Sequence, residues 1–99
     1  MMKVERKYDL NERLIDYSVL IIDQVKAIPN GIVSQHLAKQ LLRSGTSPSL
    51  NYGEAPAAES KRDFVHKLKI GLKELRESFN NIKILERANY IPVDSKLKL

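Results

Sequence analysis

A long run of apolar residues at helical spacing, between residues 61 and 88, constrains the fold more than any other feature of this sequence. Successive members are three or four residues apart, which places them on one face of an α-helix. The seam consists of Phe64, Leu68, Leu72, Leu75, Phe79 and Ile82, flanked by Val65 and Leu85. Ser60 followed by Asp63 resembles a capping box, and Asn89 before Pro92 can close the helix. We therefore predict a helix over about residues 61–88.

A second apolar run predicts a first helix over about residues 10–28, and Asp9 followed by Glu12 again resembles a capping box. Its seam consists of Leu10, Leu14, Tyr17, Ile21, Val25 and Ile28, and a second apolar stripe consists of Ile15, Val19 and Ile22. Because so wide an apolar face is typical of a helix with neighbours on both sides, we expect this helix to be buried on two sides. Pro29 and the turn at Asn30-Gly31 end it.

The second helix is expected over about residues 33–53, where Val33, Leu37, Ala38, Leu41 and Leu42 are apolar. Gly45 and Pro48 interrupt it, since a proline inside a helix removes one backbone donor and costs roughly 3 kcal/mol. Two outcomes are open: a continuous helix with a kink near residues 45–48, or a break after which Ser47 caps a new turn. We expect the kink, with the neighbouring hydroxyls bonded back to the helix backbone and Pro56 ending the helix.

These patterns predict an all-α protein in which residues 1–99 form one helical-bundle domain. Only a stub of a fourth helix, from Ser95, follows the third. The chain contains no cysteine, no apolar run long enough to span a membrane, and no apolar leader at its N-terminus, so we expect a cytoplasmic protein with no membrane partner. Its net charge of +5 is compatible with an anionic partner.

The segment from Gln40 to Glu74 resembles the four-helix-bundle family named after 23S rRNA intervening sequences. The residues that carry the resemblance are Gln40, Leu41 and Arg43; Ser47, Asn51, Glu54 and Ala55; and Ser60, Lys61, Asp63, Phe64, Leu68, Ile70, Gly71, Leu72 and Glu74. The resemblance implies a left-handed up-down four-helix bundle that assembles as a homopentamer. A related branch, the accessory proteins of diversity-generating retroelements, implies association with RNA or a nucleoprotein.

This chain departs from the family pattern because its fourth helix is largely absent. Either the protein is short or the sequence is a truncated version of a longer one. A three-helix bundle would expose part of the wide apolar face of the first helix, and such a patch favours association with a second copy or with a helix of a partner.

The family motif also suggests a polar site, whose candidate residues are Ser47, Asn51, Glu54, Ser60, Lys61 and Phe64. Asn51 and Glu54 lie one turn apart and admit two interpretations. They could form a functional polar site around an oligomer axis, or they could satisfy backbone groups near the irregularity of the second helix. The second, structural interpretation is favoured.

A basic stripe beside the seam of the third helix is the candidate nucleic-acid-binding site. At 100° per residue its members fall within one sector of the helix, away from Asp63, Glu74 and Glu77. The stripe consists of Arg62, Lys69, Lys73, Arg76, Lys83 and Arg87. It could follow a phosphate backbone or be an ordinary solvated helix face. It contains no aromatic residues on which single-stranded bases could stack.

Nothing in the sequence indicates catalysis, a cofactor, a metal or a small-molecule substrate. His36 and His66 lie on different helices, and only His66 has a carboxylate at helical spacing, Asp63. The serine-rich stretch lacks both a phosphate-binding loop and a nucleophile elbow. We therefore predict a non-enzymatic oligomeric scaffold that binds RNA or a nucleoprotein through the basic stripe. The alternative is a structural protein-interaction module that binds no nucleic acid.

Overall fold

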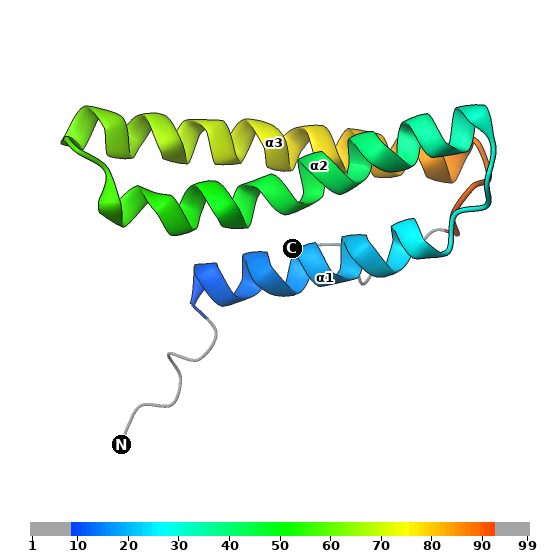
Figure 1. Cartoon of the computed structure of the whole chain (residues 1–99), viewed down its shortest axis with the longest axis horizontal. Helices are drawn as coiled ribbons and strands as arrows, with labels where there is room; N and C mark the ends of the chain where they lie inside the picture. Colours follow the sequence, from blue (N-terminus) through cyan, green and yellow to red (C-terminus); the bar gives the residue numbers. More distant parts are fainter. Residues whose placement is uncertain (1–8, 93–99) are drawn as a thin grey trace, which may run out of the picture.

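The computed structural model describes residues 9–92 as three packed helices (Figure 1). The helices are α1 (Leu10–Lys26), α2 (Ile32–Glu54) and α3 (Lys61–Arg87), and a short 3-10 helix, η2 (Ala55–Ala57), follows α2. The described residues contain no strand, so the all-α prediction is confirmed. The predicted stub from Ser95 lies outside the described residues.

The ends of the helices follow local sequence signals. The side chains of Asp9 and Ser60 each accept a hydrogen bond of 3.0 Å from the backbone N–H three residues on, as capping residues do. Helix α1 ends at Lys26, before the predicted residue 28, because the next two amides bond to carbonyls three residues back and tighten the chain ahead of Pro29. Asn89 has a φ of 64° and closes α3 with the two reversed bonds of a Schellman motif.

Helix α2 continues through Gly45 and Pro48 without a break (Figure 1). Ser47 therefore does not cap a new turn. Its hydroxyl donates to the carbonyl of Arg43 at 2.8 Å, and the Thr46 hydroxyl donates to the carbonyl of Leu42 at the same distance. These bonds are the expected contacts of serine and threonine with the backbone of their own helix.

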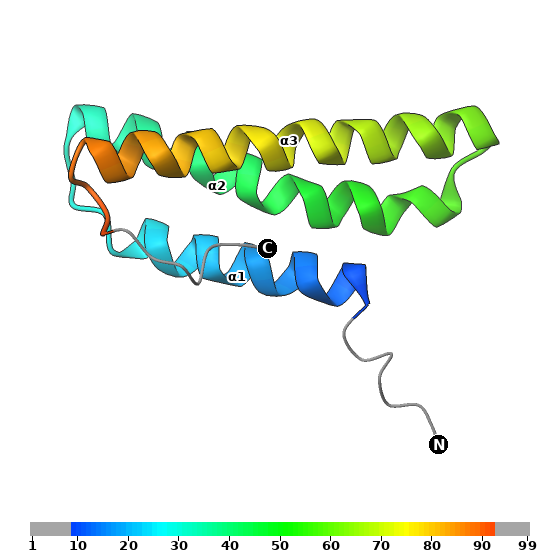
Figure 2. The ribbon, with the colours of Figure 1, turned by 180° about the vertical axis from the view of Figure 1, so that it is seen from behind.

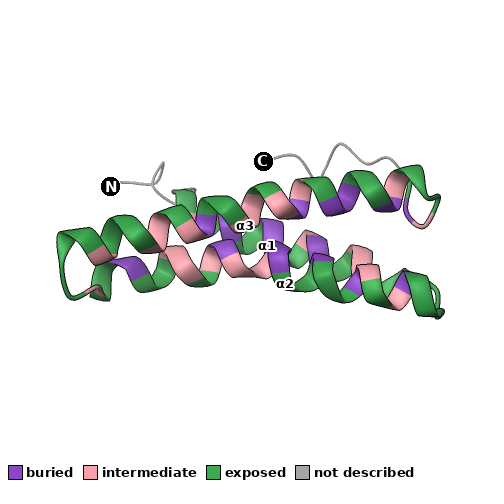
Figure 3. Ribbon diagram, turned by 90° about the horizontal axis from the view of Figure 1, so that it is seen from above, coloured by how far each residue is buried: buried purple, intermediate pink, exposed green. Residues whose placement is uncertain are grey.

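The central helix, α2, packs against both of the other helices, as the two opposite views in Figures 1 and 2 show. Buried positions lie where the helices approach one another, and exposed positions cover the outer surfaces (Figure 3). The main core cluster consists of Tyr17, Ile21, Ile28, Ala38, Leu41, Ile82, Leu85 and Ile91. The order α1, α2, α3 with short connections is that of an up-down bundle.

A close backbone approach joins α1 to α2, and large side chains join α1 to α3. Gly45 of α2 lies directly against the buried side chain of Ile21 in α1. Between α1 and α3, the Tyr17 ring meets Phe79 edge to face, and the Tyr17 hydroxyl lies 2.8 Å from the hydroxyl of Ser78. Burial raises the pKa of Tyr17 above its ordinary value, and the hydrogen bond to Ser78 offsets part of this shift.

Helix α1 is buried on one side only and exposes part of its wide apolar face, as expected for a three-helix bundle. Its first seam is in the core, but Ile15, Val19 and Ile22 of the second stripe are 42%, 49% and 37% exposed. The seam of α3 is also only partly covered, since Phe64 is 39% and Leu72 is 48% exposed. Apolar faces this wide are typical of helices with a neighbour on each side, and three helices do not supply enough neighbours to cover them.

Candidate nucleic-acid interface

All six residues of the basic stripe are exposed on α3. From Arg62 to Arg87 the stripe runs 25 residues along one straight element, a length of about 37 Å at 1.5 Å per residue. Within residues 9–92, none of the six takes part in a salt bridge. The stripe therefore presents its positive charge to solvent and to any anion that approaches.

Two acidic residues of α3, Glu74 and Glu77, lie on another face of the helix and are paired with Arg43. Arg43 of α2 donates to Glu74 at 2.7 Å and also bonds to Glu77. The hydrogen bond to Glu74 is the largest reason why the pKa of Arg43 is raised. Sequence reasoning noted Arg43 and Glu74 only as parts of a motif. The spacing of the two glutamates, three residues apart and away from the stripe, was the signal that could have identified this contact.

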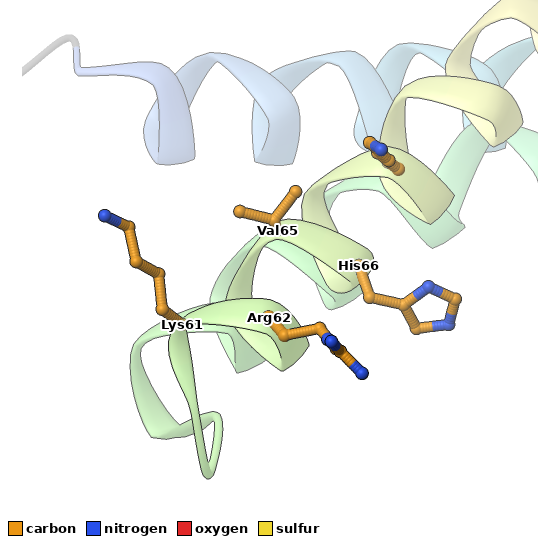
Figure 4. Close-up of a pocket in the computed structure, with 5 residues that line it drawn as sticks. Lys61, Arg62, Val65 and His66 are labelled. Carbon is orange, nitrogen blue, oxygen red and sulfur yellow. The ribbon is translucent and has the colours of Figure 1, made fainter.

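The first turns of α3 carry an open surface hollow of about 470 Å³ lined by Lys61, Arg62, Val65, His66 and Lys69. Figure 4 shows that Lys61 points away from Arg62 and His66, so the side chains diverge rather than converge on one point. Diverging cations on a convex helix suit an extended polyanion better than a small anion, because a small anion needs several donors at one place. The hollow extends the basic stripe to the start of α3.

The polar residues of the family motif do not come together as one site. The Asn51 side chain donates to the carbonyl of Ser47 in its own helix at 3.1 Å. Glu54 is 64% exposed and pairs with Lys67 at 3.5 Å. Ser60 caps α3, while Lys61 and Phe64 are exposed on its first turn. These contacts fit the structural interpretation of Asn51, and the exposed carboxylate of Glu54 lacks the enclosure of a reactive group.

Asn51 also packs against α3. A Cβ atom added at Gly71 would lie 3.5 Å from the Cβ of Asn51, which is an ordinary packing distance. Further along the same two helices, the Asn81 side chain donates to the buried hydroxyl of Ser44 at 3.0 Å. Throughout the described part of the chain, every buried side-chain nitrogen or oxygen has a hydrogen-bond partner. The polar interior is thus a satisfied structural network.

Residues 9–92 contain no group of three or more histidine, cysteine, aspartate or glutamate side chains that could hold a metal ion. No helix in the same range is long and apolar enough to cross a membrane.

The fold and the exposed stripe define a small helical-bundle protein with one strongly basic helix face. The family model of the 23S rRNA-intervening sequence proteins matches residues 6–99, and the chain belongs to this family. A solved structure of a protein with unknown function from the S23 ribosomal protein family of Bacteroides thetaiotaomicron VPI-5482 is similar to it. That protein is 33% identical, with a TM-score of 0.75, and the match covers 90% of this chain and 81% of the other. No curated protein matches the chain.

Proposed function

We propose that this protein is a small oligomeric scaffold that binds RNA through the basic stripe of α3. The observation that carries the proposal is the row of six exposed cations on one helix face, segregated from the acidic residues that Arg43 occupies. Each phosphate that such a row neutralises releases counterions and adds affinity. The names of the matching families refer to 23S rRNA and to a ribosomal protein, which supports RNA as the polyanion.

The chemistry of the stripe favours the backbone of a duplex over single-stranded bases. Lysine and arginine side chains contact phosphates, whereas unpaired bases are held by stacking on aromatic rings, which the stripe lacks. The stripe is about 37 Å long, so it can lie across successive grooves of an RNA duplex and contact phosphates on both sides of a groove. We expect binding that depends on shape and charge and that discriminates little between sequences.

The test is fluorescence anisotropy of a short labelled RNA duplex titrated with the purified chain. The stripe variant Arg62→Glu/Lys73→Glu/Lys83→Glu is expected to bind at least about tenfold more weakly than the unmodified chain, since it replaces attraction with repulsion at three phosphates. The matched control, Arg13→Glu/Lys26→Glu/Lys39→Glu, changes the net charge equally at exposed positions on α1 and α2. The proposal fails if both variants lose the same affinity or if the unmodified chain does not bind.

A structural protein-interaction module is the second candidate, and the exposed apolar stripe of α1 favours it. Ile15, Val19 and Ile22 cost free energy while they face water, because apolar surface gains about 25 cal/mol per Å² when buried. A scaffold with no nucleic-acid role would oligomerise and yet show no affinity for RNA that falls with salt. The same titration therefore separates the two candidates.

A further inference from the structure

The basic stripe of α3 contains one uncharged polar residue, Asn80. At 100° per residue the six cations occupy a sector of about 80° around the helix, and Asn80 is the only uncharged polar residue of α3 in that sector. Along the helix it lies between Arg76 and Lys83. Its side chain is exposed and, within residues 9–92, has no hydrogen-bond partner. Asn80 therefore faces the same ligand as the cations of the stripe.

No contact within residues 9–92 accounts for an asparagine at this position. The adjacent Asn81 is buried and donates to the hydroxyl of Ser44, and Asn51 donates to the carbonyl of Ser47. Asparagine is a poor helix former, because its short amide competes for backbone groups, so an exposed asparagine in the middle of a long helix weakens that helix. The amide of Asn80 offers one acceptor oxygen and two donor hydrogens to a ligand.

The side chains around Asn80 indicate a groove with a shallow floor. Helix α3 runs straight through this region (Figure 2), so Arg76 and Lys83 lie about 10 Å apart along its axis. When these two long side chains hold phosphates on opposite rims of a groove, the residue between them faces the floor of the groove. The side chain of Asn80 is much shorter than theirs and points in the same direction. It can reach the floor only where the groove is shallow.

The minor groove of an RNA duplex has this shape. It is wide and shallow and displays the 2′-hydroxyl groups, whereas the major groove of RNA is deep and narrow. In DNA the minor groove, about 6 Å wide, is too narrow for a helix about 10 Å across, and the major groove is about 8.5 Å deep. A 2′-hydroxyl group donates and accepts hydrogen bonds, as the asparagine amide does. The two groups are therefore complementary.

We propose that Asn80 hydrogen-bonds to 2′-hydroxyl groups in the minor groove of an RNA duplex, so that the protein binds RNA more tightly than DNA. This inference rests on the proposed function, because the cations of the stripe supply the affinity for phosphates and Asn80 adds the discrimination between RNA and DNA. One hydrogen bond contributes about two- to tenfold in affinity. Every ribonucleotide carries the hydroxyl group, so this recognition does not depend on base sequence.

The test compares three labelled duplexes of one sequence by fluorescence anisotropy: RNA, DNA, and RNA in which fluorine replaces every 2′-hydroxyl group. The fluorinated duplex keeps the A-form shape but cannot donate a hydrogen bond from this position, so it separates contact with the hydroxyl from recognition of shape. Asn80→Ala removes the amide, keeps all six cations and places a better helix former at an exposed position. The matched control, Gln40→Ala, removes an exposed amide from α2.

The unmodified chain and Gln40→Ala are expected to bind RNA about two- to tenfold more tightly than the fluorinated duplex, and DNA more weakly than RNA. Asn80→Ala is expected to bind RNA and the fluorinated duplex equally, with the salt dependence of the unmodified chain. The role of Asn80 is overturned if the unmodified chain shows no preference for RNA over either duplex, or if Asn80→Ala retains the preference. It is also overturned if Asn80→Ala weakens binding to all three duplexes by the same factor.

The salt dependence keeps this inference distinguishable from the proposed function. Affinity that falls steeply with salt for all three duplexes, without a preference among them, refutes the role of Asn80 alone, because the stripe then still holds phosphates. An unmodified chain that binds no RNA duplex refutes the proposed function itself.

Discussion

Gly45→Ala tests the close contact between α1 and α2, on which the bundle depends. A Cβ atom at this position would lie 2.7 Å from both γ-carbons of Ile21 and 3.1 Å from its β-carbon. Ile21 is fully buried, so its side chain has no solvent into which it can move. The methyl group can be accommodated only if α1 and α2 move apart.

Two opposing contributions decide the outcome. Alanine is better than glycine inside a helix by about 1 kcal/mol. Overpacking a core usually costs 1–3 kcal/mol, and here the added atom approaches the branched end of a residue that packs on every side. The difference lies between zero and about 2 kcal/mol, and we expect the overpacking to win and the free energy of unfolding to fall by about 1 kcal/mol. For a domain of this size, this corresponds to a loss of roughly 4–8 °C in Tm.

The assay is urea unfolding followed by circular dichroism, with Gly53→Ala as the matched control. Gly53 lies in the same helix, but a Cβ atom there meets nothing within 4 Å, so alanine should stabilise by about 0.5 kcal/mol. In an Ile21→Ala background both γ-carbons are gone and only the β-carbon contact of 3.1 Å remains, so Gly45→Ala should cost less there than in the unmodified chain. The reasoning is refuted if Gly45→Ala and Gly53→Ala stabilise the chain equally.

Three smaller changes test other contacts. Tyr17→Phe removes a buried hydrogen bond and should cost about 1 kcal/mol in urea unfolding at neutral pH. Because the pKa of Tyr17 is raised in the folded state, the protonated hydroxyl stabilises the fold fully below about pH 10. This stabilisation is lost as the pH rises through the pKa of the folded state. Tyr17→Phe should therefore lose less stability at alkaline pH than the unmodified chain. Arg43→Ala should lower the free energy of unfolding by less than about 1 kcal/mol, because Arg43 is half exposed. Added salt should reduce this loss, and a loss that salt does not change contradicts the prediction. Asn89→Ala should lower the Tm by forcing alanine to a φ of 64° at a cost of about 1 kcal/mol, whereas Asn89→Gly should not.

Local signals predicted the helices well. Seam spacing and the capping residues Asp9 and Ser60 are properties of neighbouring residues, so they can be found without knowledge of the fold. The continuity of α2 through Pro48 was expected for the same reason, since hydroxyl side chains nearby bond back to the helix.

Contacts between distant residues could not be predicted in this way. The pair Tyr17 and Ser78 is separated by 61 residues, and the closeness of Gly45 to Ile21 depends on the angle at which two helices cross. Periodicity shows that a face is apolar but not what covers it. Only the structure shows which part of the wide apolar face of α1 is exposed, namely the stripe that contains Val19.

The position of the basic stripe follows from sequence, but its freedom from ion pairs does not. Only the structure shows that Glu74 and Glu77 are engaged by Arg43 on another face of α3. The motif residues Asn51 and Glu54, in contrast, looked like one site in sequence because they are one turn apart. The structure gives them separate partners, since Asn51 bonds to the carbonyl of Ser47 in its own helix and Glu54 pairs with Lys67 of α3.

The most direct test of the central claim is the salt dependence of RNA-duplex binding by the unmodified chain. Each neutralised phosphate contributes about 0.9 to the slope of log affinity against log salt, so contacts by most of the six cations predict a slope of about −3 to −5. The slope should become shallower by about 0.9 for each stripe cation replaced by glutamine. A slope near zero, or one that these substitutions leave unchanged, would contradict the assignment of the stripe as the RNA-binding surface.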